Sequence, residues 1–335
     1  MTNLNKVFKS VLFAIAYGDA FGMPSEMMSY NEIKARIGYI DQFLPSQENI
    51  YFNRSLKAGT VTDDTIFSLI LTEVILENNG VISTTSFVDK MIDLLNSNKI
   101  DKTVIGPSTL KAFTSISDGV LIEAAGIFGT TNGAAMKIAP ISLINIYSDE
   151  DKLIDDVYKI CLPTHNTRVA ISGAITIAYI IYAFIRNDID WNTLWSNVYR
   201  ILDKSKDLGV NTSHSLLESR IKMVENLLRS PLTIDEKIIF IQNDIGTSMD
   251  TLETIPSAIA LAYLANGDLR ACARLCANIG GDTDTIGAIA CAILNAKEHL
   301  ILDEELAFIQ TVNNLDFDDI SERLANCVIQ RSSST

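Results

Sequence analysis

The chain has 335 residues, 47% of them hydrophobic and 20% charged, so it can bury a sizeable core as one large domain or two ordinary ones. This composition excludes a disordered tail protein, a collagen-like repeat and a disulfide-stapled miniprotein. With 27 basic and 41 acidic residues the formal net charge is −14, which argues against nucleic-acid backbones and anionic membrane surfaces as partners.

The pattern of apolar residues is helical along most of the chain. Residues 67–75 place apolar side chains at the spacing of one helix face, and residues 216–227 and 286–293 show comparable spacing. Alternation typical of strands is scarce, and only a short segment around residues 50–52 could form a strand. Prolines fall mostly between the periodic stretches and are expected to separate helices of ordinary length: Pro45, Pro107, Pro140, Pro163, Pro231 and Pro256.

Neither an internal repeat nor a Gly/Ser-rich linker divides the chain into two halves. We therefore predict an all-α protein, a single compact domain over residues 1–330 with about a dozen helices. The polar end at residues 331–335 is expected to be a disordered tail.

Two features bear on the compartment. Residues 169–185 are uncharged and reach the lower limit for a membrane span, but a single run rich in small residues is more typical of a central helix that is apolar on all sides. The five cysteines are too few and too scattered for a disulfide framework, and Cys272 and Cys276 lack the further ligands of a zinc site. We predict buried thiols in a reducing cytoplasm and no membrane partner.

Two segments place carboxylates and hydroxyls directly before an apolar helix. Residues 59–65 read GTVTDDT, and residues 280–287 read GGDTDTIG. Capping is the simplest interpretation, because Thr and Asp side chains accept hydrogen bonds from the free N–H groups of a first turn. Capping needs one or two such residues, however, whereas each segment supplies four or more.

The excess of oxygen ligands favours a metal site. Carboxylates without a neighbouring His or Cys suit Mg²⁺, Mn²⁺ or Ca²⁺ rather than zinc. Asp282 and Asp284 can converge where a turn enters a helix, and with Asp63 and Asp64 they can hold two divalent ions about 3.5–4 Å apart. Without metal, four such carboxylates in a partly dry site would repel one another.

Five motifs together resemble the ADP-ribosylglycohydrolases, a family that includes the dinitrogenase reductase-activating glycohydrolases. The motifs follow the family's order and span residues 18 to 287, which is nearly the whole chain. They are GDAFGMPSE at 18–26, TDDT at 62–65, the TNGAAM loop at 131–136, Thr164-His165, and GGDTDT at 280–285.

The resemblance implies an all-helical fold with two divalent metals, usually Mg²⁺ or Mn²⁺, in a central cleft. Motif matching assigns one side of the metal site to Thr62, Asp63 and Asp64, and the other side to Asp282, Asp284 and Thr285. Threonine hydroxyls and carboxylates are acceptable ligands for these ions.

Three carboxylates are candidates for catalysis. Glu26 closes the first motif, and the resemblance implies that it handles a proton or positions a water; on its own it would be a solvated loop carboxylate. Asp63 and Asp64 are the other candidates, and the general base cannot be assigned among the three without geometry. Asp19 is interpreted as a helix-capping residue or as a support for the ligands.

The resemblance also implies that the loop before residue 137 contacts ADP-ribose. Its candidate contacts are Gly129, Thr131, Asn132 and Gly133, because small residues let main-chain N–H groups approach an anion. Without the resemblance, this loop would be a turn that opens a helix. His165 is expected to line the substrate cleft, although alone it would be taken for a core histidine.

Some positions depart from the family pattern. Lys137 stands where relatives often have arginine, which keeps the charge and loses the two-pronged hydrogen bonding of a guanidinium. Cys291, Asn295 and His299 stand where relatives usually have glycines, so one wall of the cleft could be reshaped. The six implied metal ligands are all present.

The leading hypothesis is metal-dependent hydrolysis of the glycosidic bond between ADP-ribose and a modified protein side chain, by a monomer. A second is hydrolysis of a small free nucleoside or ADP-ribose derivative, because the GPST segment at 106–109 resembles a segment of bacterial relatives with unsettled substrates. A third is a non-catalytic binding or structural protein like the family's lens crystallins. The intact metal ligands argue against the third.

Overall fold

The computed structural model describes residues 4–49, 51, 54–97 and 102–334. The possible strand at 50–52 lies outside these residues except for Tyr51, which forms a bend. Across the described ranges the protein has 17 α-helices and no strand, so the predicted all-α class and single compact domain are confirmed. There are more helices than the expected dozen, because several span only one or two turns.

The helices in chain order are α1 (Leu4–Gly22), α2 (Tyr30–Arg36), α3 (Asp63–Glu77), α4 (Thr84–Asn96), α5 (Pro107–Ser117), α6 (Ile122–Ala125), α7 (Ala139–Ile144), α8 (Glu150–Cys161), α9 (Arg168–Ile185), α10 (Leu194–Ser205), α11 (Leu217–Arg229), α12 (Ile234–Phe240), α13 (Thr251–Leu264), α14 (Leu269–Ile279), α15 (Thr283–Glu298), α16 (Asp303–Asn313) and α17 (Phe317–Ser334).

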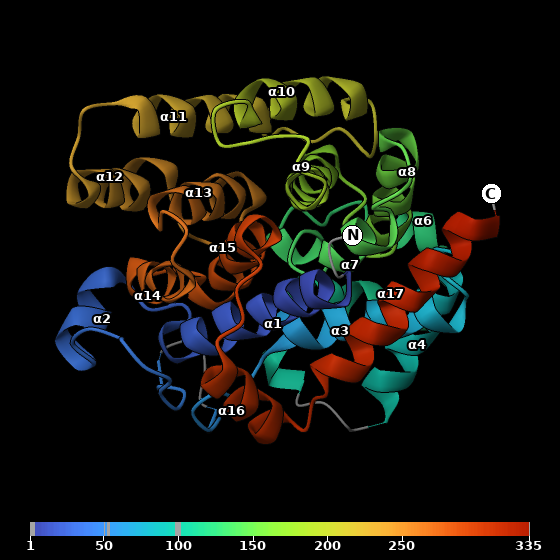
Figure 1. Ribbon diagram of the computed structural model, residues 1–335, viewed down its shortest axis with the longest axis horizontal. Helices are drawn as coiled ribbons and strands as arrows, with labels where there is room; N and C mark the ends of the chain where they lie inside the picture. Colours follow the sequence, from blue (N-terminus) through green and yellow to red (C-terminus); the bar gives the residue numbers. More distant parts are fainter. Residues whose placement is uncertain (1–3, 50, 52–53, 98–101, 335) are drawn as a thin grey trace.

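Helix α9 is one of the helices at the centre of the molecule. It is long and apolar enough to cross a membrane by length and composition alone, but 94% of it is buried inside the protein. It packs against α8, α10, α13 and α15, and Figure 1 shows it surrounded by other helices. The interpretation of residues 169–185 as a central core helix is therefore confirmed.

Helices α1 and α15 form the most extensive helix pair of the fold, and they cross at an unusually short distance. A Cβ atom added at Gly18 would lie 2.1 Å from the carbonyl oxygen of Gly287. A Cβ atom at Gly22 would lie 2.2 Å from the carbonyl oxygen of Thr283. Only glycine allows this approach, which brings the first motif of the chain beside the start of α15.

Both acidic segments begin a helix, as expected. Asp63 and Asp64 form the first turn of α3, and Thr62 is its N-cap. Asp282 is the N-cap of α15, and Asp284 lies in the first turn of that helix.

Two expectations from the sequence are wrong. Pro256 lies inside α13 rather than between helices. Almost all α13 residues on either side of this proline are buried. Helix α17 continues to Ser334, so residues 331–334 are helical rather than a disordered tail, and Thr335 lies outside the described residues.

The expectation for the thiols is confirmed. Cys161, Cys272, Cys276 and Cys291 are buried, Cys327 is partly buried, and all five are free.

Candidate active site

Asp19 connects α1 to the start of α3. Its carboxylate is fully buried and accepts hydrogen bonds from the backbone N–H groups of Thr62, at 2.9 Å, and Thr65, at 3.2 Å. It also accepts from both threonine hydroxyls. Asp19 therefore caps the N-terminus of α3 from a different helix, so the capping role expected from the sequence is present but its recipient is distant in the chain.

The two acidic segments meet at one point. The Thr62 hydroxyl lies 3.2 Å from Asp64 Oδ2 and 3.4 Å from Asp284 Oδ2. The Thr285 hydroxyl lies 3.3 Å from Asp64 Oδ2. Four of the six implied metal ligands thus surround a common centre, and all four are at least nine-tenths buried.

The carboxylate oxygens form two overlapping groups, each with its atoms within 4.8 Å of one another. One group contains Asp19, Asp64 and Asp284. The other contains Glu26, Asp282 and Asp284. Asp284 belongs to both groups and therefore lies between two positions where a cation would be surrounded by carboxylates.

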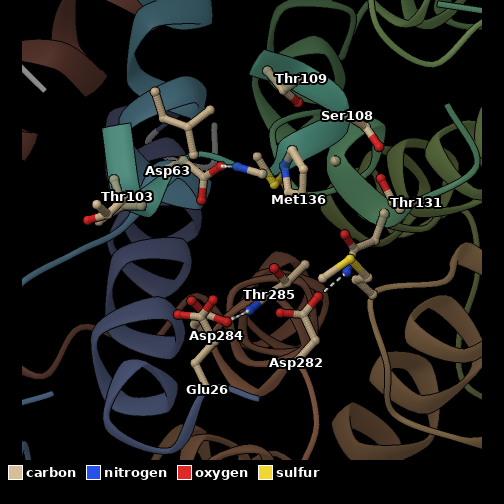
Figure 2. A pocket seen from close by; sticks show the side chains of 17 residues that line it. Glu26, Asp63, Thr103, Ser108, Thr109, Thr131, Met136, Asp282, Asp284 and Thr285 are labelled. Atoms are coloured by element: carbon tan, nitrogen blue, oxygen red, sulfur yellow. Dashed lines mark hydrogen bonds between the residues drawn. The ribbon is translucent and has the colours of Figure 1, made fainter. Parts of the chain in front are cut away.

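Asp63 occupies a different wall. Its Oδ2 accepts a hydrogen bond from the Gly106 N–H at 3.0 Å, and its side chain lines the pocket above the other acids. Figure 2 shows Asp63 across the pocket from Asp282 and Asp284. It belongs to neither group of close carboxylate oxygens, so its side chain faces the pocket rather than the shared centre.

The TNGAAM loop is tied to the acidic cluster by Asn132. Its side-chain amide donates to Asp282 Oδ2 at 2.5 Å and to the Thr254 hydroxyl at 2.9 Å. Its backbone N–H donates to the Met249 carbonyl at 2.9 Å. Thr131, Asn132 and Gly133 line the same pocket as the carboxylates, as expected for contacts to a ligand.

His165 and Gly129 lie behind this loop instead of lining the pocket. His165 is fully buried, and its Nε2 lies 2.9 Å from the Thr131 hydroxyl. A Cβ atom at Gly129 would lie 2.1 Å from the Thr164 carbonyl oxygen. Both residues therefore position the loop, and the expected placement of His165 on the cleft surface is not what the structure shows.

Glu26 is held by a residue that sequence reasoning missed. Its carboxylate forms an ion pair with Arg54, in which the side chains are 13% and 5% exposed. Its backbone carbonyl accepts a hydrogen bond from the Asn49 side chain at 2.9 Å. Arg54 stands alone in a loop without periodicity or motif, so no signal in the sequence pointed to it.

Burial and mutual repulsion raise the pKa of the clustered carboxyls. The pKa of Asp19 is raised to about 7, mainly by desolvation and then by the nearby Asp284 charge. Desolvation also raises the pKa of Asp63 to about 7, against the opposing hydrogen bond from Gly106. The pKa values of Asp64 and Asp282 are raised well above the ordinary value by burial and by the Asp284 charge.

Two buried cations flank these carboxylates. Burial raises the pKa of Asp284, and the neighbouring Arg54 charge opposes that rise. Lys137 is 1% exposed, and burial lowers the pKa of its ammonium to about 8. The nearby groups that oppose this decrease are the Cys161 thiol and the carboxyls of Asp63 and Asp64.

These residues fit a site for hard divalent cations. Asp64 Oδ1 is buried and has no hydrogen-bond partner among the described residues, although a buried carboxylate oxygen normally has one. The ligands are carboxylates and hydroxyls, without a neighbouring thiol or imidazole at the shared centre, which is the set that Mg²⁺ and Mn²⁺ prefer. A cation there would satisfy the orphaned oxygen and relieve the repulsion that raises the pKa values.

The fold and the pocket define a class of protein, all-helical, with a carboxylate-rich centre between two helix N-termini. The chain belongs to the ADP-ribosylglycohydrolase family, whose sequence profile matches residues 2–298. The resemblance seen in the five motifs is therefore confirmed.

The chain is also similar to individual proteins over most of its length. The chain is 36% identical over 327 residues to the Escherichia coli (strain K12) protein described as "Uncharacterized protein YegU", with 96% of each chain covered. It is 30% identical to an uncharacterized protein of Archaeoglobus fulgidus, with 88% of each chain covered. It is 23% identical to the ADP-ribosylhydrolase ARH3 of Xenopus tropicalis, over 82% of this chain and 84% of that protein.

A solved structure has the same fold. It is described as an "ADP-ribosylglycohydrolase-related protein complex", and it superposes with a TM-score of 0.73 at 18% sequence identity. The match covers 98% of this chain and 100% of the other.

Proposed function

We propose that this protein is a metal-dependent hydrolase that cleaves the glycosidic bond between ADP-ribose and a modified protein side chain. Membership of the ADP-ribosylglycohydrolase family supports a hydrolase of ADP-ribose derivatives. The observation that carries the proposal is the convergence of both acidic segments on one centre, where Asp64 Oδ1 has no partner. This centre opens onto a pocket lined by the TNGAAM loop.

Two divalent ions, Mg²⁺ or Mn²⁺, are proposed as cofactors. Asp64 and Asp284, with the hydroxyls of Thr62 and Thr285, would hold one ion, and Asp282 with Asp284 would contribute to the second. When bound, such ions supply Lewis acidity and activate a water for attack on an anomeric carbon. Asp19 holds Thr62 in place rather than facing the pocket, so its role is to orient that ligand.

The residues of the chain have separate roles in the proposed reaction. Glu26 lines the pocket beside Asp282 and Asp284, where it can accept a proton from the attacking water. The ionised carboxylates stabilise the positive charge that develops on the sugar in a glycosidic transition state. The Asp63 carboxylate, fixed by the Gly106 N–H, is placed to hold a sugar hydroxyl on the opposite wall.

The proposal is tested by incubating purified protein with peptides that carry ADP-ribosyl-arginine or ADP-ribosyl-serine, in Mg²⁺ or Mn²⁺ and then in EDTA. We expect release of ADP-ribose from one of the two linkages, with loss of the reaction in EDTA. If neither peptide releases ADP-ribose in either metal, the proposed activity is wrong.

A small ADP-ribose derivative or nucleoside is the second candidate substrate. The observation in its favour is that residues 106–109, the segment similar to bacterial relatives of unsettled substrate, line the pocket next to Asp63. Free nucleosides and small ADP-ribosyl compounds assayed in parallel distinguish the two candidates. Cleavage of these compounds without cleavage of either peptide would favour the second.

We further propose that the protein works as a monomer in the cytoplasm, in line with its free cysteines and its buried apolar helix. Light scattering of the purified protein and fractionation of expressing cells test these two points.

A further inference from the structure

Lys137 is a buried cation without a carboxylate partner. Lys137 is 1% exposed, and within the described residues its ammonium donates its one hydrogen bond to the carbonyl oxygen of Gly133. In the described part of the chain, no carboxylate lies within ion-pair distance of it. Burying an ammonium in this way is unfavourable unless the surrounding charges compensate for the lost hydration.

The surroundings of Lys137 show where the compensation comes from. Asp63 and Asp64 on α3 are the carboxylates whose charges act on it, and Cys161 at the end of α8 is the third group. The Lys137 charge in turn helps to lower the pKa of His165. The ammonium therefore lies near the acidic cluster and near His165, whose side chain supports the TNGAAM loop through Thr131.

With two divalent ions bound, the formal charges around the pocket sum to zero only when the Lys137 ammonium is counted. Six carboxylates gather there, those of Asp19, Glu26, Asp63, Asp64, Asp282 and Asp284. Among the residues that the structure describes, Arg54 and Lys137 are the two buried cations that act on them. With two divalent ions the site would be neutral, so each buried cation reduces the negative charge that attracts those ions.

The hydrogen bond of Lys137 has a second consequence. It fixes the Gly133 carbonyl within the turn that follows Asn132, and Asn132 contacts Asp282. Gly133 in turn packs against the His165 ring, where an added Cβ would lie 2.8 Å from Cε1. Lys137 thus holds the ligand-facing turn from behind without reaching the pocket itself.

We propose that Lys137 is a positioning residue with two separable effects: its hydrogen bond holds the TNGAAM turn in its ligand-binding conformation, and its charge weakens the affinity of the carboxylate cluster for divalent cations. This inference rests on the proposed function, because it assigns the cluster to metal and the loop to ADP-ribose.

The test uses Lys137→Met, which removes charge and donor at similar length, and Lys137→Arg, which keeps both. Calorimetric titration of Mn²⁺ into EDTA-stripped protein at neutral pH should give a Kd about three- to tenfold lower for Lys137→Met than for wild type. The Kd of ADP-ribose in saturating Mn²⁺ should rise about five- to tenfold for the same variant, as expected for one lost hydrogen bond. Lys137→Arg should stay within about twofold of wild type in both titrations.

Lys90→Met is the matched control, because it removes one positive charge from the exposed surface of α4, where Lys90 pairs with Glu77. It should change neither Kd. A Lys137→Met protein with unchanged or weaker Mn²⁺ binding would overturn the proposal. So would Lys137→Arg if it matched Lys137→Met.

If Lys137→Met does not fold, Lys137→Gln takes its place in the Mn²⁺ titration, since it also lacks the charge. An unchanged Kd for that variant overturns the proposal in the same way. Failure of the wild-type protein to bind Mn²⁺ would instead contradict the proposed function, so the two failures are distinguishable.

Discussion

Asp284 is the carboxylate on which the candidate site depends most. It belongs to both groups of close carboxylate oxygens, and its charge contributes to the raised pKa values of Asp19, Asp63, Asp64 and Asp282. In the absence of a cation, these like charges in a dry site destabilise the folded protein. A single side chain therefore opposes folding and favours metal binding at the same time.

We expect Asp284→Asn to separate these two effects. Removing the charge should raise the free energy of unfolding of the metal-free protein by about 1–2 kcal/mol, because the remaining carboxylates repel one another less. The same change should weaken Mn²⁺ binding at least about 100-fold, since the carboxylate common to both groups of close oxygens would no longer be available as a ligand. Urea unfolding in EDTA and calorimetric titration measure the two quantities.

The control for that experiment is Glu304→Gln, which removes an exposed acidic charge from the start of α16. It should leave Mn²⁺ affinity unchanged. If Asp284→Asn bound Mn²⁺ as tightly as wild type, the proposal that Asp284 contributes to both cation positions would be contradicted.

Arg54 supports Glu26 through an ion pair that is nearly buried, with side chains 5% and 13% exposed. Arg54→Met should lower the free energy of unfolding by about 3 kcal/mol, because the remaining carboxylate is left buried without its partner. Urea denaturation in EDTA measures this change.

Arg323→Met is the matched comparison, because Arg323 forms ion pairs with Glu73 and Asp319 while its own side chain is 43% exposed. Exposed pairs contribute about 0–1 kcal/mol, so this variant should be close to wild type. Equal losses for the two arginine variants would show that Arg54 holds Glu26 no more firmly than a surface pair.

The crossing of α1 and α15 is the element of the fold that assembles the site. Gly18 and Gly287 allow the two backbones to touch, and this contact places Asp19 where it can cap α3. The first turns of α3 and α15 then face each other across Thr62 and Asp284. The geometry of the candidate metal site is therefore set by helix packing and not by the acidic segments alone.

Gly18→Ala tests the crossing. The added methyl would lie 2.1 Å from a backbone oxygen, so the helices must separate, and we expect a loss of at least about 3 kcal/mol in the free energy of unfolding. Weaker Mn²⁺ binding should accompany that loss, because Asp19 moves away from Thr62.

Gly106→Ala serves as the matched glycine change for stability, because an added Cβ there would meet only Asp63, at 3.9 Å. Its stability should stay within about 1 kcal/mol of wild type, measured by thermal and urea unfolding. Similar losses for both variants would show that the close approach of α1 and α15 is not what Gly18 provides.

Two helices show why element boundaries could not be predicted fully from local signals. Pro256 breaks helical hydrogen bonding in isolation, yet α13 continues through it because most residues on either side of the proline are buried. The last residues of the chain are polar and carry no helix signal of their own. They continue α17, whose earlier turns pack against α1.

For the molecule as a whole, the raised carboxyl pKa values make the stability of the metal-free protein depend on pH. The pKa of Asp19 and of Asp63 is about 7 in the folded protein, against an ordinary value of 3.8. Between these values the folded protein binds protons that the unfolded chain has released, so stability falls as pH rises. His165 acts in the opposite direction, because burial lowers its pKa well below 6.5.

We expect the five aspartates with raised pKa values to outweigh the single histidine. The thermal midpoint of the EDTA-treated protein should therefore fall by several degrees from about pH 5 to about pH 8. Saturating Mn²⁺ should reverse the fall at the upper end, because the ions replace the missing protons. Scanning calorimetry in both conditions measures this.

In EDTA, the thermal midpoint of Asp284→Asn should depend less steeply on pH than that of wild type. The reason is that the neighbouring carboxyls would have pKa values closer to the ordinary one. A midpoint that rises steadily over the same pH range would mean that the carboxyls are not the dominant titrating groups.

The sequence by itself determined the fold class, the family and most of the pocket. The spacing of apolar residues is a local property of helices, and the motifs record residue types that the chemistry requires, so both can be read without coordinates. The two acidic segments were placed correctly at helix N-termini for the same reason.

Only the tertiary structure decided which of these residues share a centre. It placed Asp63 on the opposite wall, moved His165 behind the loop, and brought in Arg54 and Lys137, which no pattern had marked as partners of the carboxylates. These relations join residues from separate helices and loops. These relations follow from the packing of α1 against α15 and from the burial of the side chains. Neither the packing nor the burial can be read from the spacing of residues along one segment.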